Sequence, residues 1–157
     1  MIRAILACDQ DWGIGKDGDM PWPHNSADLK WFKKMTIGQA VVMGRKTWDS
    51  LPFKPLPGRK NIVISNSMQS YREAEVVPTH IYKSRLATLS RTEAVCIIGG
   101  AQLIHDCLNT IDELWLSRIE GSYNCDAVLP VESILEQFVL DSVGPETDVY
   151  IEKWVRK

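Results

Sequence analysis

The stretch VCIIGGAQLI, residues 95–104, reads as a buried strand that passes through two glycines into a helix. Its continuous apolar run is typical of a strand covered on both faces. Gly99 and Gly100 lack a Cβ, so a ligand or another backbone can approach this junction closely. The N–H groups at the start of the following helix would favour an anion. The stretch therefore indicates either a phosphate site or a tight turn between a parallel strand and its helix.

Seven further runs rich in Val and Ile predict strands in the same way. With the run above, the eight strands are expected at 2–8, 40–43, 61–64, 75–77, 94–98, 113–119, 137–143 and 148–155. Helices are expected near 26–36, 45–51, 84–91 and 101–108. This alternation predicts an α/β fold: a mixed, mostly parallel eight-stranded sheet with about four helices on both faces. The turn signal VGPETD predicts an antiparallel hairpin at the C-terminal end.

The totals describe one ordinary globular domain over residues 1–157. A net charge of −2 gives no sign of nucleic acid or of an anionic membrane as a partner. No run approaches the roughly 20 apolar residues of a membrane span. The four cysteines and three histidines are scattered, so neither a disulfide framework nor a metal site is expected. We expect a cytoplasmic protein and, since no long apolar face is predicted to be exposed, a monomer.

The segment GIGKDG, residues 13–18, matches the glycine pattern of dinucleotide-binding loops. That pattern requires a helix directly behind it, whereas Pro21 and Pro23 oppose an early helix here. The segment is better interpreted as a glycine-rich loop. It is either a mobile lid over a pocket at the end of the first strand or a plain surface turn.

A second junction of strand, glycine and helix lies in VVMGRKT, residues 41–47. Arg45 and Lys46 fall in the first helical turn, where cations oppose the helix dipole. A bound anion would remove this conflict and would meet both cations together with open N–H groups. The alternative is that both side chains extend into solvent. Two such junctions in one small sheet suit a ligand with two phosphates.

The turn PLPGRK, residues 55–60, presents Arg59 on a proline-restrained loop. A guanidinium held in this way is suited to bidentate recognition of a carboxylate. The alternative is an exposed arginine with no specific partner.

Asp28 occupies an unusual place on the first expected helix. On a helix that begins near Ser26, Asp28 falls beside Trp31 and Phe32, and the lysines of the helix fall on the opposite side. An acid three residues after Asn25 resembles a capping box, which is one interpretation. A carboxylate among aromatic side chains needs a partner, however, and no cation shares its face. The other interpretation is a ligand with a cationic or donor-rich edge.

These pieces resemble, in order, the dihydrofolate reductases of the bacterial type. The resemblance runs almost from end to end and is carried by IGKDGDMPW (14–22), ADLKWFKKMT (27–36), VVMGRKTWDSL (41–51), LPGRKNIVIS (56–65) and IIGGAQL (97–103). It implies NADPH as the cofactor and 7,8-dihydrofolate as the substrate. Antifolate inhibitors are expected in the substrate pocket.

The resemblance implies a substrate pocket around Asp28, which would hold N3 and the 2-amino group of the pterin. Ser117 falls where a threonine usually bonds this acid, and Trp22 would order a water near it. Arg59 would bind the glutamate α-carboxylate. The remaining substrate residues implied in this way are Ile5, Ala7, Leu29, Phe32, Leu51 and Ile98.

The resemblance also implies an NADPH site with a closing lid over residues 14–22 and a cis peptide between Gly99 and Gly100. The cofactor residues it implies are Ala7, Ile14, Gly15, Met20, Gly44, Arg45, Lys46, Thr47, Ser65, Asn66, Gly99, Gly100, Ala101, Gln102 and Leu103.

Several positions depart from the family pattern. Gln102 stands where an arginine is frequent and Asn66 where a serine is frequent, so preference for NADPH over NADH would depend on Arg45 and Lys46. Ile104 replaces a frequent tyrosine near the nicotinamide. Cys125 and Ala127 replace the usual glycine and threonine on either side of Asp126, which leaves the contacts that close the lid open to question.

The reaction implied is hydride transfer to C6 of dihydrofolate with protonation at N5, which supplies tetrahydrofolate for one-carbon metabolism. Asp28 would orient and polarise the pterin, and burial would raise its pKa. One alternative is a relative that reduces another heterocycle, such as the pyrimidine reductase of riboflavin synthesis. Another is a protein that binds NADPH or a pterin without turnover.

Overall fold

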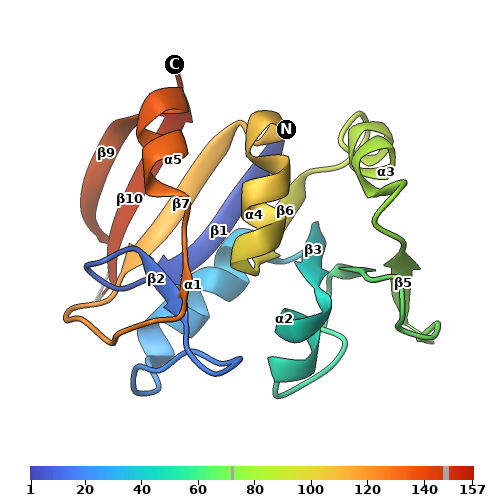
Figure 1. The fold of residues 1–157 in the computed structure, drawn as a ribbon, viewed down its shortest axis with the longest axis horizontal. Helices are drawn as coiled ribbons and strands as arrows, with labels where there is room; N and C mark the ends of the chain where they lie inside the picture. Colours follow the sequence, from blue (N-terminus) through green and yellow to red (C-terminus); the bar gives the residue numbers. More distant parts are fainter. Residues whose placement is uncertain (72, 147–148) are drawn as a thin grey trace.

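Eight strands form one continuous sheet in the computed structural model, which describes residues 1–71, 73–146 and 149–157 (Figure 1). The strands are β1 (Ile2–Cys8), β3 (Ala40–Gly44), β4 (Lys60–Ile64), β5 (Ala74–Val77), β6 (Val95–Gly99), β7 (Glu113–Arg118), β9 (Phe138–Glu146) and β10 (Val149–Arg156). Their order is β5-β4-β3-β6-β1-β7-β10-β9, and only the pairings of β10 with β7 and β9 are antiparallel. The predicted mostly parallel sheet with an antiparallel C-terminal hairpin is thereby confirmed.

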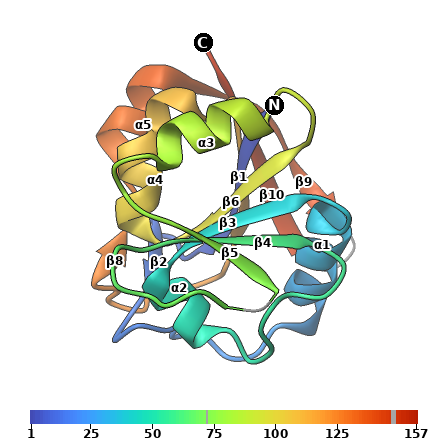
Figure 2. The ribbon, with the colours of Figure 1, turned by 90° about the vertical axis from the view of Figure 1, so that its right-hand side faces the viewer.

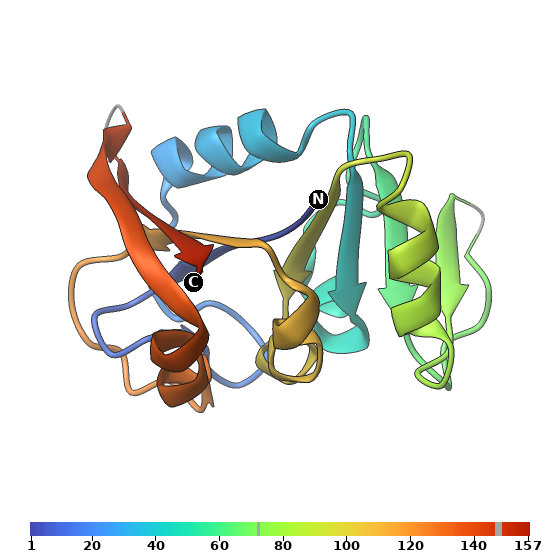
Figure 3. The same ribbon diagram turned by 90° about the horizontal axis from the view of Figure 1, so that it is seen from above.

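The helices are α1 (Ser26–Thr36), α2 (Arg45–Ser50), α3 (Tyr82–Leu89), α4 (Ala101–Cys107) and α5 (Val131–Gln137), with a short 3-10 turn η1 (Leu108–Thr110). Helix α1 covers one face of the sheet, and α3, α4 and α5 cover the other (Figures 2 and 3). Each face has its own buried cluster. Trp31 and Trp48 belong to the cluster under α1 and α2, and Leu103 and Ile134 belong to the cluster on the opposite face.

Two features of the fold were not predicted. The fifth helix, α5, precedes β9 directly, where the sequence had indicated only a loop and then a strand. A small separate sheet pairs β2 (Gly13–Gly15) with β8 (Ala127–Val128), and this sheet joins the segment interpreted as a glycine-rich loop to the segment around Asp126. The first segment is therefore fastened to the second rather than lying on the surface alone.

The C-terminal hairpin is longer than predicted. Strand β9 continues through Val143 to Glu146, so most of the expected VGPETD turn is paired strand. Residues 147 and 148, the last two of that stretch, lie outside the described residues. None of the helices in the described part of the chain is long and apolar enough to cross a membrane.

Candidate active site

The side chain of Asp28 on α1 is buried, and the helix is capped by Asn25 instead. Asn25 is the N-cap, and its Oδ1 accepts the N–H of Asp28 at 3.0 Å. The Asp28 side chain is 8% exposed. Trp31 on the same helix is also buried. The inward orientation expected from the helical pattern is therefore observed, and the capping-box interpretation accounts only for the backbone.

Asp28 faces a hydroxyl that is equally short of partners. Ser117 on β7 is 1% exposed, and its Oγ has no hydrogen-bond partner among the described residues. Burial raises the pKa of Asp28, and the neighbouring Ser117 hydroxyl lowers it in part. In the described part of the chain, Asp28 forms no ion pair. A buried carboxylate without a cation, next to a hydroxyl with no other partner, is costly unless a ligand completes the site.

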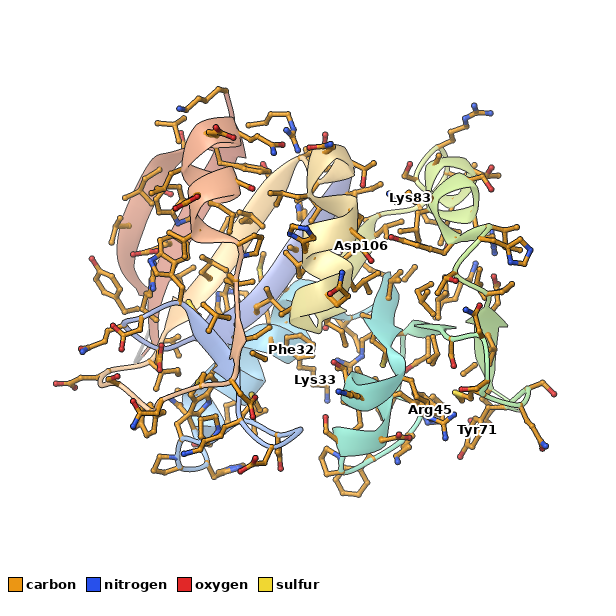
Figure 4. The ribbon with its side chains drawn as sticks, viewed as in Figure 1. Phe32, Lys33, Arg45, Tyr71, Lys83 and Asp106 are labelled. Atoms are coloured by element: carbon orange, nitrogen blue, oxygen red, sulfur yellow. The ribbon has the colours of Figure 1, made fainter. Side chains whose placement is uncertain are left out.

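The predicted apolar residues of the substrate site gather in the cluster that contains Trp31. Ile5 on β1 and Ile98 on β6 belong to its buried part, and Phe32 on α1 and Leu51 after α2 are partly buried against it. Figure 4 shows Phe32 under the middle of the sheet, at the foot of β1. Ala7 lies beside Ser117, its register partner on β7. Leu29, in contrast, is 43% exposed and lies at the rim of the site.

Arg59 is held in a fixed orientation by its loop and by the end of α1. Its Nε donates to the carbonyl of Pro57 at 2.9 Å, and Nη1 donates to Thr36 Oγ1 at 3.1 Å. Buried Asn61 closes the same loop, because its Nδ2 donates to the Arg59 carbonyl at 3.0 Å. The loop also contains a cis peptide at Lys54–Pro55. Burial lowers the pKa of Arg59, yet an arginine remains charged at neutral pH. The guanidinium is thus positioned rather than freely exposed.

The two glycine junctions lie side by side in the sheet. Strand β3 pairs with β6 so that Met43 lies opposite Gly99, and the Gly99–Gly100 peptide is cis. Gly99 has φ +132°, and a Cβ there would lie 3.3 Å from Thr47 Oγ1. A Cβ on Gly44 would lie 3.9 Å from the backbone N of Gly100. Both helices begin at a glycine without a side-chain cap. This cradle has room for a backbone-bound anion and fits the phosphates of a dinucleotide.

The predicted cofactor side chains around this cradle bond within their own helices. Arg45 Nε contacts Asp49 at 3.0 and 3.2 Å, and Gln102 Nε2 donates to Asp106 at 2.9 Å. Lys46 is exposed. In Figure 4, Arg45 lies out toward the β5 edge of the molecule. These charges are accessible to a ligand but are not preorganised for one.

The remaining predicted cofactor positions on the β4 side shape their own loop. Ser65 Oγ accepts the N–H groups of Ser67 at 3.2 Å and Met68 at 3.1 Å. Asn66 exchanges hydrogen bonds with Thr79, whose N–H donates to Asn66 Oδ1 at 2.9 Å. This loop is therefore ordered by its own polar side chains.

An open cavity of about 420 Å³ lies between the start of α4 and β8. Its lining residues are Ala101, Gln102, His105, Val128 and Pro130. Leu103, another predicted cofactor residue, is buried directly behind them on α4. The cavity extends the glycine cradle toward the two fastened loops.

The implied lid, residues 14–22, and the preceding Gly13 form the lid segment, which makes the contacts that the substitutions at Cys125 and Ala127 had left open. Gly15 is the register partner of Ala127, and the Gly15 carbonyl accepts the Asp126 N–H at 3.0 Å. The Asp17 N–H donates to Asp126 Oδ2 at 3.0 Å. The lid is therefore fastened to the facing loop, residues 120–130, despite those substitutions.

The lid brings Trp22 inward and leaves Met20 outside. Trp22 is 8% exposed, and its ring packs edge-on against Tyr123 at 5.9 Å between centroids. Met20 is 49% exposed, whereas Ile14 is partly buried against the core. Of the two, Trp22 is thus the lid residue that lies inside.

Sequence reasoning missed three residues that shape the site. Thr36 orients Arg59, Tyr123 packs on Trp22, and Asp9 joins the two loops. Asp9 could have been noticed, because an acid directly after a buried strand is a polar group at the edge of the core. Tyr123 gave no local signal, since its contact spans about a hundred residues of sequence.

The fold and the site together define a class of enzyme. An α/β sheet holds a glycine cradle for two phosphates at the ends of neighbouring strands, next to a buried carboxylate with apolar walls and a positioned guanidinium. Such a site is that of a dinucleotide-dependent oxidoreductase acting on a flat, polar-edged ring with an acidic tail.

Known proteins identify the particular family. The dihydrofolate reductase family model matches residues 1–147. The chain is 42% identical to a type 3 dihydrofolate reductase of Salmonella typhimurium over 131 residues, which is 83% of this chain and 78% of the relative. It is 40% identical to a dihydrofolate reductase of Neisseria meningitidis over 129 residues, which is 82% of this chain and 78% of the relative.

A solved structure agrees with these relatives. The dihydrofolate reductase from Enterococcus faecalis, complexed with NADP(H) and RAB-propyl, matches with a TM-score of 0.85 at 28% identity. The match covers 100% of this chain and 96% of that one. The chain belongs to the dihydrofolate reductase family. It is an NADPH-dependent oxidoreductase that reduces dihydrofolate to tetrahydrofolate.

Proposed function

We propose that Asp28 holds the pterin ring by its donor edge and polarises it for reduction. The observation that carries this assignment is a buried carboxylate that forms no ion pair among the described residues, beside the Ser117 hydroxyl, which has no other hydrogen-bond partner there. A ring edge with two donors, N3–H and the 2-amino group, supplies the missing hydrogen bonds of Asp28. Phe32, Ile5 and Ile98 provide apolar walls for the ring.

Hydride is delivered to C6 and a proton to N5. Asp28 bonds the opposite edge of the pterin, so it cannot also reach N5 directly. A water held near Trp22 carries the proton, and the negative charge of Asp28 makes the bound pterin more basic.

The glycine cradle and its surroundings hold the cofactor. Thr47, Gly99 and Gly100 shape the phosphate site, with Gly44, Ala101, Gln102 and Leu103 continuing it along both helix starts. Arg45 and Lys46 reach the adenosine phosphate from α2, and Ser65 and Asn66 border the same end. Ala7, Ile14, Gly15 and Met20 border the nicotinamide end. When bound, NADPH supplies the hydride, while the lid excludes water and fixes the approach of the two rings.

Arg59 gives the enzyme its preference for substrates with a glutamate tail. The guanidinium, oriented by Thr36 and Pro57, binds the α-carboxylate. Leu29 and Leu51 border the aminobenzoyl segment between the two ends. Antifolate inhibitors occupy the same pocket, and the E. faecalis relative crystallised with NADP(H) and RAB-propyl supports a shared ligand site.

The reductase domain spans residues 1–157, acts as a monomer and supplies tetrahydrofolate for one-carbon metabolism in the cytoplasm. The single sheet built from both ends of the chain supports one domain. All four cysteines lie in the described part of the chain as free thiols, and three of them are buried, which suits a reducing compartment.

One assay tests the proposal against its two alternatives. The protein is mixed with NADPH and dihydrofolate, and loss of the reduced-nicotinamide absorbance is recorded. Turnover that depends on Asp28 and is faster with tail-bearing folate than with a tail-less pterin supports these roles. Binding without turnover would instead identify a protein that has lost catalysis. Activity only on another heterocycle would assign the site to a different reductase.

A further inference from the structure

Asp9 is a buried acid that the reaction above does not use. It follows β1 directly and is 1% exposed. Its Oδ1 accepts the N–H groups of Asp11 and Gly13, each at 2.9 Å. Its Oδ2 accepts the N–H of Tyr123 at 3.0 Å and the thiol of Cys125 at 3.6 Å. A single carboxylate thus joins the start of the lid segment to the facing loop.

The surroundings of Asp9 keep it ionised. Burial on its own raises the pKa of Asp9, but the N–H groups of Gly13, Tyr123 and Asp11 outweigh that effect and hold the pKa below its ordinary value. Hydrogen bonds to a charged acceptor are stronger than those between neutral groups. The connection between the two loops therefore persists across the neutral range.

The two segments approach each other most closely where Asp9 bonds them. A Cβ on Gly13 would lie 2.5 Å from the Cβ of Cys125 and 2.6 Å from its Sγ. Gly13 does not have a left-handed φ, so it is space and not backbone conformation that requires glycine here. Any larger residue would push the lid away from the facing loop.

The backbone of Asp9 is fixed from the opposite side. Arg118 Nη1 donates to the Asp9 carbonyl at 3.0 Å, and its Nε pairs with Glu152 at 2.9 Å. The same guanidinium stacks over the ring of Trp12 at 4.1 Å. Arg118 therefore holds the Asp9 backbone in place, and with it the carboxylate.

This connection reaches the catalytic centre through one aromatic contact. Asp9 fixes the backbone N–H of Tyr123, and the Tyr123 ring packs edge-on against Trp22. Trp22 is the lid residue assigned above to the proton-carrying water. A shift of the facing loop would therefore move the side chain next to the reacting ring.

We propose that Asp9 is a positioning residue, which clamps the lid segment against the facing loop at the Gly13–Cys125 approach and so places Trp22 for the reduction. This inference rests on the role proposed above for the lid and Trp22. Asp9 lies outside the proposed substrate and cofactor pockets. Gly13 leaves the space that the Cys125 side chain occupies, so the two residues allow the segments to pack closely.

The first test is Asp9→Asn. An amide has one oxygen and one NH₂ group, so the variant can accept the hydrogen bonds of the lid segment or those of the facing loop, but not both. We expect the rate of hydride transfer in a single turnover to fall about tenfold, which equals about 1.4 kcal/mol. The KM for dihydrofolate should change less than twofold. The matched control is Glu120→Gln, an exposed acid in the facing loop, which should leave both quantities unchanged.

The second test leaves Asp9 intact and separates the same two segments. Gly13→Ala should lower the hydride-transfer rate by a similar factor, because its methyl group collides with Cys125. Cys125→Gly alone should stay within twofold of the unmodified enzyme. The double variant Gly13→Ala, Cys125→Gly should recover most of the rate, since the collision with Cys125 has been removed and only an approach of 3.1 Å to Asp9 Oδ1 remains.

The results separate this inference from the proposed function. If the unmodified enzyme reduces dihydrofolate and folded Asp9→Asn keeps its single-turnover rate, the clamp is refuted while the function stands. If Asp9→Asn does not fold, the cycle at Gly13 and Cys125 decides, and an additive cycle refutes the clamp. If the unmodified enzyme fails to oxidise NADPH with dihydrofolate, the proposed function itself fails.

Discussion

The polar groups on the substrate side of the active site are buried and short of partners, whereas those on the cofactor side are exposed and already paired. Asp28 and Ser117 are buried, at 8% and 1% exposure; among the described residues Asp28 forms no ion pair, and Ser117 Oγ has no hydrogen-bond partner other than Asp28. Arg45 and Gln102 are exposed and already bonded to Asp49 and Asp106. Buried unpaired groups are expensive, whereas exposed ion pairs contribute little. Substitutions should therefore have large effects on the substrate side and small ones on the cofactor side.

The largest expected effect is that of Asp28→Asn. We expect kcat at pH 7 to fall by about 10²–10⁴-fold, the range that assisted proton transfer contributes, because the proton-carrying water then meets a less basic pterin. The deficit should shrink in acid, where solvent can protonate the substrate. The measurement is the pH profile of NADPH oxidation for both enzymes. The exposed acid Asp141 offers a matched control, and a profile for Asp28→Asn that follows that of Asp141→Asn would remove Asp28 from the mechanism.

The next effect is that of Arg59→Ala on substrate binding. Loss of a charged hydrogen bond should weaken dihydrofolate binding by about 1.5–3 kcal/mol. Affinity for a pterin that lacks the glutamate tail should not change, which separates loss of the carboxylate contact from damage to the pocket. Equilibrium fluorescence titration measures both constants. Equal losses for the two ligands would contradict the assignment of Arg59.

A smaller effect is expected on the cofactor side. Arg45→Ala should raise the KM for NADPH about fivefold, near the 1 kcal/mol upper limit for an exposed ion pair. The KM for NADH should change less than twofold, and added salt should reduce the difference. Asp49→Asn is the informative companion, because it releases Arg45 and should lower the KM for NADPH. Equal responses to the two cofactors would place the adenosine phosphate elsewhere.

The smallest effect concerns stability and has the opposite sign to the loss of activity. Burial raises the folded-state pKa of Asp28, so the folded state binds more protons and loses stability as pH rises through that range. Asp28→Asn removes this cost at neutral pH and should raise the midpoint of thermal unfolding by about 2–4 °C. At a pH below the pKa of Asp28 in both the folded and the unfolded state, the variant and the unmodified enzyme should unfold at the same midpoint. Calorimetry at the two pH values checks the sign, and a lower midpoint at neutral pH would contradict it.

Sequence periodicity predicted the main sheet well because its signals are local. All eight strands and the first four helices appear within a few residues of their expected places. Helix α5 was missed because it is only seven residues long and runs directly into β9, so it has too few turns to show a clear apolar period. Strand β2 is GIG, a sequence without strand propensity, which is extended only because it pairs with β8.

In the candidate site, too, the features that depend on local sequence were predicted, and those that depend on contacts between distant segments were not. The inward orientation of Asp28 follows from its place on one helix, and the glycine cradle follows from two neighbouring strand ends. The partners of Arg59 and Trp22, namely Thr36 and Tyr123, depend on packing between distant segments. The engagement of Arg45 by Asp49 is local at i, i+4, but the pattern alone does not decide between this pair and a ligand.

Helix α1 carries Asp28 near its start and Thr36, the hydrogen-bond partner of Arg59, at its end. Eight residues at 1.5 Å each separate the two by about 12 Å along the axis. With the roles proposed for Asp28 and Arg59, the length of α1 sets the distance between the contact with the ring and the contact with the tail. A ligand with the same ring but a spacer of another length would then make only one of the two contacts, so the enzyme would select its substrate by length as well as by its end groups.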